Sequence, residues 1–165
     1  LRGITASDNG QRLYIADYEM GITVLDLESR VAQRLAGPDT LNFGGIEGLE
    51  YWNGHLVMIQ NGNEPQRVMR LALSADGGSV EGVAPLAIAQ PIFNYPNFGT
   101  INGAKLVFFA NSHWVRDLTS PTPIQVASTF VDAPPDLISP DFQKFWDEYY
   151  ESQGIEPPDE VPGGP

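Results

Sequence analysis

One pattern of short strands recurs three times along this chain and constrains its fold more than any other feature. In each copy a short segment containing glycine leads through an Asn-Gly turn into an apolar strand, and the copies occupy residues 3–17, 45–60 and 98–110. Asn-Gly is favoured at such turns because a tight type I′ hairpin needs positive φ at both central residues. The pattern therefore predicts three β-hairpins.

A further strand follows two of the hairpins. Residues 21–27 and 66–73 alternate between apolar and polar side chains, as half-buried strands do. The leucines of the three apolar strands, Leu13, Leu56 and Leu106, are 43 and 50 residues apart, which is the length that one four-stranded propeller blade occupies. We therefore predict an all-β fold, a partial β-propeller of about two to three blades. A β-sandwich of unrelated hairpins is the alternative.

The composition agrees with a β-rich domain that has many turns. Of the 165 residues, 42% are hydrophobic, 17 are Gly and 14 are Pro. These proportions supply enough apolar material for a core and favour turns over long helices. The chain has no Cys, which excludes disulfides, zinc–thiolate sites and cysteine nucleophiles.

The negative charge of the chain, −12 in total, is concentrated near its C-terminal end. Residues 1–116 hold 8 basic and 11 acidic side chains, whereas residues 117–165 hold one basic side chain, Lys144, and ten acidic ones. We therefore predict propeller blades over 1–116 and an acidic, Pro-rich extension over 117–165. The acidic balance argues against nucleic-acid and anionic membrane partners, and no apolar run approaches the roughly 18 residues that span a bilayer.

The extension contains one segment with helical periodicity. Ser139-Pro140-Asp141 has the residue types of a helix start, and Gly154 supplies a stop. Aromatic side chains share one face of this segment: Phe142, Phe145, Trp146, Tyr149 and Tyr150. The sequence predicts an amphipathic helix over about 140–153 whose aromatic face packs against the propeller, its remaining half or a partner chain.

Three parts of the strand pattern carry more specific motifs. They are Gly3-Ile4 with Asp8-Asn9-Gly10 and Leu13–Asp17, then Gly45–Leu49, and then Ala110–Trp114. In these motifs the chain resembles the six-bladed, calcium-dependent propellers of the gluconolactonase, regucalcin, paraoxonase and strictosidine-synthase superfamily. The resemblance covers about residues 1–116, so we expect the C-terminal part of a six-bladed ring. It implies metal-assisted hydrolysis of a lactone or ester at the propeller axis.

The resemblance also implies a site for calcium or another divalent cation, which prefers oxygen ligands. Glu47 stands where the family has a metal-binding and catalytic Asp, so it is the expected metal ligand and catalytic residue. Arg2 and Gly48 stand where family members have Asn ligands. Because a guanidinium only donates hydrogen bonds, Arg2 cannot bind a metal. We therefore expect Arg2 and Glu47 to form an ion pair in place of the metal; a frayed terminal residue is the alternative.

Polar residues at strand ends extend the expected site. Asn61 follows one apolar strand and Asn111 ends another, so both are expected to face the central channel; turn and capping roles are the alternatives. His113 is expected to line a pocket, where an imidazole can act as a base, or else to be a hydrogen-bonded residue at a strand end. The expected substrate-binding residues are thus Arg2, Asn61, Asn111 and His113.

Two functions of different classes follow from these observations. The first is hydrolysis of a lactone or ester with Glu47 at the reacting centre. The second is a non-catalytic propeller with an eroded metal site that binds a polar ligand or a protein partner. The sequence has no Gly-x-Ser-x-Gly motif, which argues against a serine hydrolase. A structural subunit assembled through the aromatic helix is a third possibility.

Overall fold

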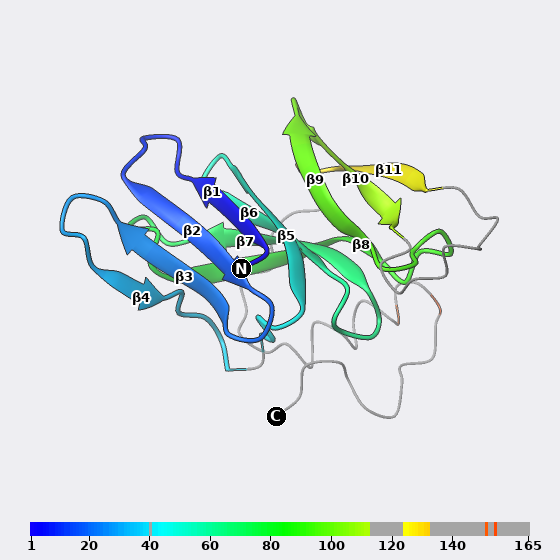
Figure 1. The fold of residues 1–165 in the computed structure, drawn as a ribbon, viewed down its shortest axis with the longest axis horizontal. Coiled ribbons are helices and arrows are strands. Elements are labelled where there is room, and N and C mark those ends of the chain that lie inside the picture. The colour runs from blue at the N-terminus through cyan, green and yellow to red at the C-terminus, as the bar shows by residue number, and fades with distance from the viewer. Residues whose placement is uncertain (40, 113–123, 133–150, 152–153, 155–165) are drawn as a thin grey trace.

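The computed structural model describes residues 1–39, 41–112, 124–132, 151 and 154. Within these residues eleven strands form three antiparallel sheets, coloured from blue to yellow along the chain in Figure 1. The strands are β1 (Gly3–Ala6), β2 (Arg12–Asp17), β3 (Gly21–Asp26), β4 (Ala32–Arg34), β5 (Ile46–Trp52), β6 (His55–Gln60), β7 (Arg67–Leu73), β8 (Val80–Ile88), β9 (Asn97–Asn102), β10 (Lys105–Asn111) and β11 (Gln125–Phe130). The all-β prediction is confirmed.

Each sheet is a meander in which neighbours in the chain are neighbours in space. The first sheet has the order β1-β2-β3-β4 and the second β5-β6-β7-β8, while the third has the order β9-β10-β11. All three predicted hairpins and both predicted following strands are present. Four-stranded antiparallel meanders that follow one another along the chain are the units of a propeller.

The predicted type I′ geometry is right for one hairpin of the three. Asn53 and Gly54 both have positive φ, at 46° and 77°, and they join Trp52 directly to its partner His55. At the other two hairpins only the glycines, Gly10 and Gly103, have positive φ. The connection between β1 and β2 is longer than two residues. In the β9–β10 hairpin the two-residue turn begins one position later than predicted, after Asn102. A dipeptide alone therefore does not fix the register.

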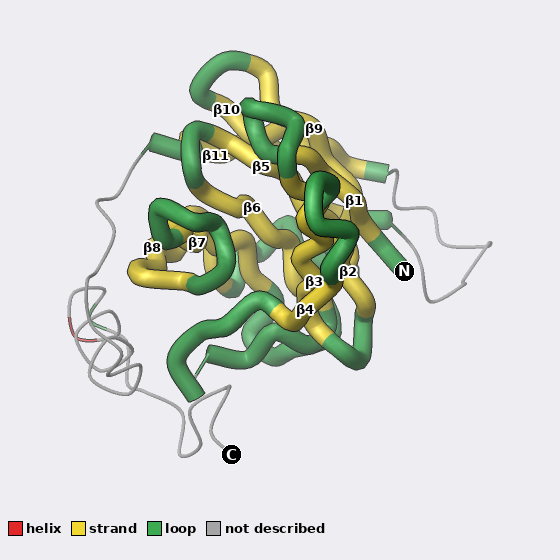
Figure 2. The backbone as a smooth tube through the Cα atoms, turned by 90° about the vertical axis from the view of Figure 1, so that its left-hand side faces the viewer, coloured by secondary structure: helices red, strands yellow, loops and turns green. Residues whose placement is uncertain are grey.

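Two apolar cores lie between the three sheets, and Figure 2 shows the backbone of these sheets from the side. Alternate residues of β6 divide between the two cores, because successive side chains of a strand point to opposite faces. Leu56 and Met58 pack in the core that contains residues of the first sheet, and Val57 and Ile59 pack in the core that contains residues of the third. The second sheet is therefore covered on both faces.

The first strand of each sheet lies on the inner side of the arrangement. β1 is in contact with β5, and β5 is in contact with β9, although these strands are far apart in the sequence. In a propeller the innermost strands of neighbouring blades lie side by side around the central axis in this way. The three sheets therefore form an arc around one axis.

The described part of the predicted extension includes a strand. β11 lies within residues 117–165 and pairs along β10, so the third sheet continues past residue 116. Its sequence, QVASTF, does not alternate strictly between polar and apolar residues, so periodicity did not reveal this strand. The predicted helix over 140–153 falls outside the described residues, apart from Glu151. Among the described residues there is no helix with the length and hydropathy of a membrane span.

Candidate site at the propeller axis

Polar residues gather where the inner strands begin. In each sheet the start of the inner strand lies opposite the end of the next strand, because the two strands are antiparallel, with Gly3 paired to Ala16, Gly48 to Ile59 and Asn97 to Phe109. The residues just before Gly3, Gly48 and Asn97 are Arg2, Glu47 and Pro96. The residues two places after Ala16, Ile59 and Phe109 are Tyr18, Asn61 and Asn111. We call this set the axial end.

Glu47 owes its position to an irregularity in β5. Ile46 pairs with Gln60 and Gly48 pairs with Ile59, so Glu47 is the extra residue of a β-bulge. A bulge redirects a side chain that would otherwise follow the alternation of the strand, and bulges are frequent beside functional sites. The Glu47 residue is only 2% exposed, which is unusual for a carboxylate.

The ion pair expected between Arg2 and Glu47 is present. The Arg2 Nε atom lies 3.6 Å from Glu47 Oε1, and the two side chains are 34% and 3% exposed. The Arg2 guanidinium also lies over the ring of Tyr18, 5.6 Å from its centroid, in a cation–π arrangement. Arg2 is thus held by two neighbouring elements rather than frayed.

The second oxygen of Glu47 makes this carboxylate chemically distinctive. Within the described part of the chain, Oε2 is buried and has no hydrogen-bond donor. Burial raises the pKa of Glu47, while the positive charges of Arg2 and the N-terminal ammonium oppose that rise. Glu47 therefore combines an ion-paired oxygen with a desolvated acceptor.

Tyr18 and Asn61 connect the three sheets at the axial end. The Tyr18 hydroxyl donates to Asn61 Oδ1 at 3.4 Å, and Asn61 Nδ2 donates to the carbonyl oxygen of Pro96 at 3.0 Å. Burial, followed by the charge of Glu47, raises the pKa of Tyr18, so its hydroxyl stays protonated and can donate. Asn61 was predicted from the sequence and Tyr18 was not, although Tyr18 directly follows β2 as Asn61 directly follows β6.

Asn111 is the member of the axial end that the third sheet contributes. It is 3% exposed, and its Oδ1 atom is buried without a donor in the part of the chain that the structure describes. The backbone around it is fixed, because Ser112 donates its hydroxyl to the carbonyl oxygen of Tyr95 at 2.6 Å. The remaining expected site residue, His113, lies outside the described residues.

A buried polar network holds the loop before β5 against the axial end. Arg67 Nε donates to Gln60 Oε1 at 2.7 Å, and Gln60 Nε2 donates to the carbonyl oxygens of Asn42 and Gly44. A Cβ at Gly62 would lie 2.6 Å from both Tyr18 Oη and the Cα of Gly45, so only glycine fits there. The sequence alone gives no sign of this packing role of Gly62.

The described residues do not fit a calcium ion. Calcium takes six to eight oxygen ligands, and the unpartnered side-chain oxygens found at the axial end are Glu47 Oε2 and Asn111 Oδ1. The only carboxylate of the set already faces the Arg2 guanidinium, whose charge repels a cation. No three described His, Asp or Glu residues are grouped so that they could hold a metal ion.

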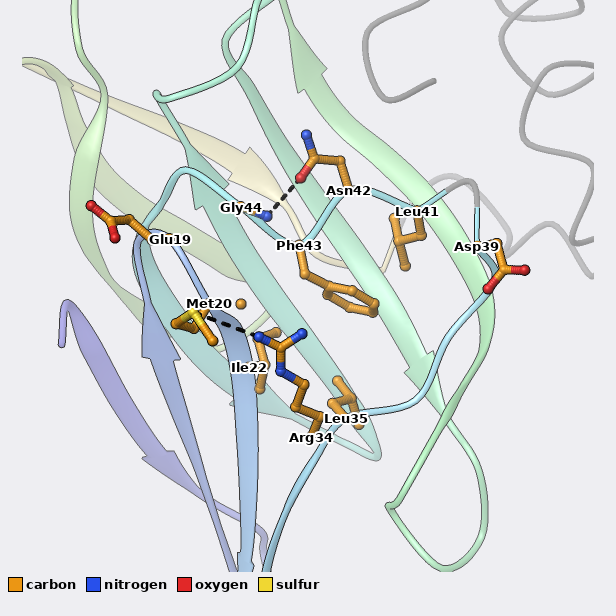
Figure 3. Close-up of a pocket in the computed structure, with 11 residues that line it drawn as sticks. Glu19, Met20, Ile22, Arg34, Leu35, Asp39, Leu41, Asn42, Phe43 and Gly44 are labelled. Atoms are coloured by element: carbon orange, nitrogen blue, oxygen red, sulfur yellow. Dashed lines mark hydrogen bonds between the residues drawn. The ribbon is translucent and has the colours of Figure 1, made fainter. Parts of the chain in front are cut away.

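A separate hollow of about 430 Å³ lies beside the axial end, between the β2–β3 turn and the loop before β5 (Figure 3). Charged side chains surround an apolar floor that includes the ring of Phe43, and Arg34 Nη2 lies 3.7 Å from the Met20 sulfur. Its lining residues are Glu19, Met20, Gly21, Ile22, Arg34, Leu35, Asp39, Leu41, Asn42, Phe43 and Gly44. None of these belongs to the axial end.

Comparisons with known proteins place the fold. No protein-family model matches the chain, and no curated protein sequence matches it. The structure of TolB from Acinetobacter baumannii is similar over 82% of this chain and 31% of that one, with a TM-score of 0.54 and 17% identity. The PQQ-bound aldose sugar dehydrogenase from Streptomyces coelicolor is similar over 78% of this chain and 42% of that one, with a TM-score of 0.52 and 15% identity.

These two structures are of the β-propeller type, so the chain is part of a β-propeller. The predicted fold class, a partial propeller, is confirmed. The chain spans less than half the length of either structure. At such low identity the likeness concerns the fold alone.

Proposed function

We propose that the axial end binds a small hydroxylated ligand directly, through Glu47, Asn111 and Arg2, without a metal ion. The observation that carries the proposal is the buried Oε2 atom of Glu47, which has no donor among the described residues. A buried acceptor without a donor costs about 1–3 kcal/mol, which a hydroxyl donated by a ligand offsets.

The other members of the set suit the same kind of ligand. Asn111 Oδ1 is a second buried acceptor without a donor among the described residues, so a ligand with two hydroxyls satisfies both atoms. The Arg2 side chain is 34% exposed and carries donor groups that suit a ligand oxygen. A cyclic polyol, or a lactone that bears hydroxyls, has this combination of donors and acceptors.

Calorimetric titration with anhydroglucitol, a cyclic polyol that has no carbonyl, tests the binding proposal. The variant Glu47→Gln replaces a charge-assisted acceptor by an amide, so we expect about tenfold weaker binding or more. Glu50→Gln is the matched control, because Glu50 lies on the same strand and burial also raises its pKa. Equal affinities for the wild type and Glu47→Gln would contradict the proposal.

Hydrolysis of a lactone or ester, the activity implied by the resemblance, is the second candidate. It is favoured by the raised pKa of Glu47, because a general base works best when its pKa approaches the working pH. In this reaction water adds to the carbonyl carbon as Oε2 takes its proton. The C–O bond to the leaving oxygen then breaks, and that oxygen receives the proton.

Proton release from gluconolactone, measured against pH, tests the second candidate. The rate is expected to rise with pH through the pKa of Glu47, because only the ionised carboxylate accepts a proton. Glu47→Gln is expected to lose about a hundredfold or more in rate, whereas Glu50→Gln keeps it. A Glu47→Gln variant that hydrolyses the lactone at the wild-type rate would exclude Glu47 as the base.

A further inference from the structure

Neighbouring sheets pack through equivalent sets of residues at both inter-sheet contacts of the described chain. Residues of β2 that face the second sheet, Tyr14 and Ala16, pack in the same core as Leu56 and Met58 of β6. One sheet further along, Val57 and Ile59 of β6 pack in the same core as three residues of β10, Leu106, Phe108 and Ala110.

Strand register shows that these are equivalent positions. Leu13, Leu56 and Leu106 each follow the first residue of the second strand in their sheet. Tyr14 and Ala16 therefore correspond to Val57 and Ile59, and the same positions of β10 are Val107 and Phe109. In the first two sheets, the next sheet along the chain covers the side chains at these positions. The covering residues of the next sheet lie at the alternate positions of its second strand, as Leu56 and Met58 do in β6.

The covering sheet is missing for the third sheet among the described residues. Phe109 is 42% exposed, whereas its counterparts Ile59 and Ala16 are 1% and 0% exposed. Val126 and Phe130 of β11 point to the same face, because they pair with Phe109 and Lys105 of β10, and they are 58% and 54% exposed. Phe109 and Val126, together with Phe98, Thr100 and Val107, line an apolar groove of about 330 Å³ on this outer face of the third sheet.

The first sheet has, on its outer face, the residue positions that form the other side of this inter-sheet contact. Leu13 and Ile15 correspond to Leu56 and Met58, which cover the sheet before them, but no described sheet precedes the first one. Ile4 pairs with Ile15 and Leu25 pairs with Leu13, so all four share this outer face. Ile4 is 64% exposed.

We propose that the outer face of the third sheet packs on the outer face of the first sheet in a second copy of this chain. The same contact forms a second time, between the third sheet of the second copy and the first sheet of the first copy. Two copies therefore close a ring around a twofold axis. The chain itself carries both halves of a contact that it already makes twice, which favours a second copy over an unrelated partner. Head-to-tail contacts of this kind either close into rings or extend into filaments.

The molar mass of the 165-residue chain, measured by light scattering after size exclusion, tests the ring. A single chain has a mass of 18.0 kDa, and we expect twice that value. Phe109→Asp and Ile4→Asp each place a charge in both contacts of the ring, so each variant is expected to run as the single chain. Both residues are exposed in the single chain, so its fold should persist, which circular dichroism checks.

Further measurements separate this arrangement from others. Val31→Asp, an exposed apolar position in the β3–β4 turn, is the matched control and is expected to keep the doubled mass. An equimolar mixture of Phe109→Asp and Ile4→Asp has one intact contact and is expected to regain part of the doubled mass. A single-chain mass for the wild type would overturn the proposal. So would filaments, or a doubled mass for Ile4→Asp, which indicates contact between two third sheets.

Discussion

At the scale of single residues, the axial end is defined by one carboxylate and its guanidinium partner. The resemblance of the sequence motifs to the calcium-dependent propellers singles out Arg2 and Glu47, and their 3.6 Å ion pair agrees with the predicted pairing. Sequence alone could not predict the bulge that buries Glu47, because the bulge depends on the register between β5 and β6. Nor could it predict Tyr18, since a tyrosine after a strand is equally typical of an ordinary turn.

The pH dependence of stability is predicted at this scale. Because burial raises the folded-state pKa of Glu47 above its ordinary value of 4.5, the folded state holds this proton more tightly than the unfolded state. The contribution of Glu47 to stability is therefore complete below pH 4.5 and is lost as pH rises through the folded-state pKa. Glu47→Gln lacks this titration.

Chemical denaturation of wild type and Glu47→Gln over a range of pH measures the effect. The unfolding free energy of the wild type, minus that of the variant, is expected to fall as pH rises above 4.5. The same comparison for the exposed Asp8→Asn provides the control. A difference that grows with pH in this range would mean that the ion pair with Arg2 outweighs burial.

At the scale of elements, the apolar strands were predictable because they repeat. The spacing of Leu13, Leu56 and Leu106 identified β2, β6 and β10, and alternation identified β3 and β7. Three strands were not predicted. β4 has only three residues, all exposed, β8 contains Gly82 and Pro85, which are uncommon inside strands, and β11 lies in a segment dominated by its acidic and proline content. Short edge strands depend on pairing with a neighbour more than on their own residues.

The central strand β6 is predicted to be the most sensitive element. Leu56 is fully buried, so Leu56→Ala removes packing atoms and leaves a cavity, at an expected cost of about 2–5 kcal/mol in unfolding free energy. Leu27→Ala is the control, since Leu27 is 43% exposed and its truncation is expected to cost less than about 1 kcal/mol. Urea denaturation compares the two variants, and equal losses would contradict the assignment of β6 to the core.

At the scale of the whole molecule, the described residues form an arc of a propeller with two complete inter-sheet cores and two uncovered end faces. The repeat length predicted this architecture, since each unit needs a neighbour on either side to bury its faces. The expected ion pair between two sheets is present, with Arg2 at the position where the resemblance implies a metal ligand. What the sequence could not supply is the hydrogen-bonded link from Tyr18 through Asn61 to Pro96, because that link depends on groups from different sheets.

The central claim is that the axial end is held by this ion pair and not by a metal ion. Differential scanning calorimetry of the chain in calcium chloride and in EDTA tests it most directly. A ligand present at about a hundredfold above its dissociation constant stabilises a folded protein by about 2.7 kcal/mol, which moves the unfolding temperature by several degrees. We predict the same unfolding temperature in both solutions. A higher unfolding temperature in calcium, seen for the wild type and absent in Glu47→Gln, would contradict the claim.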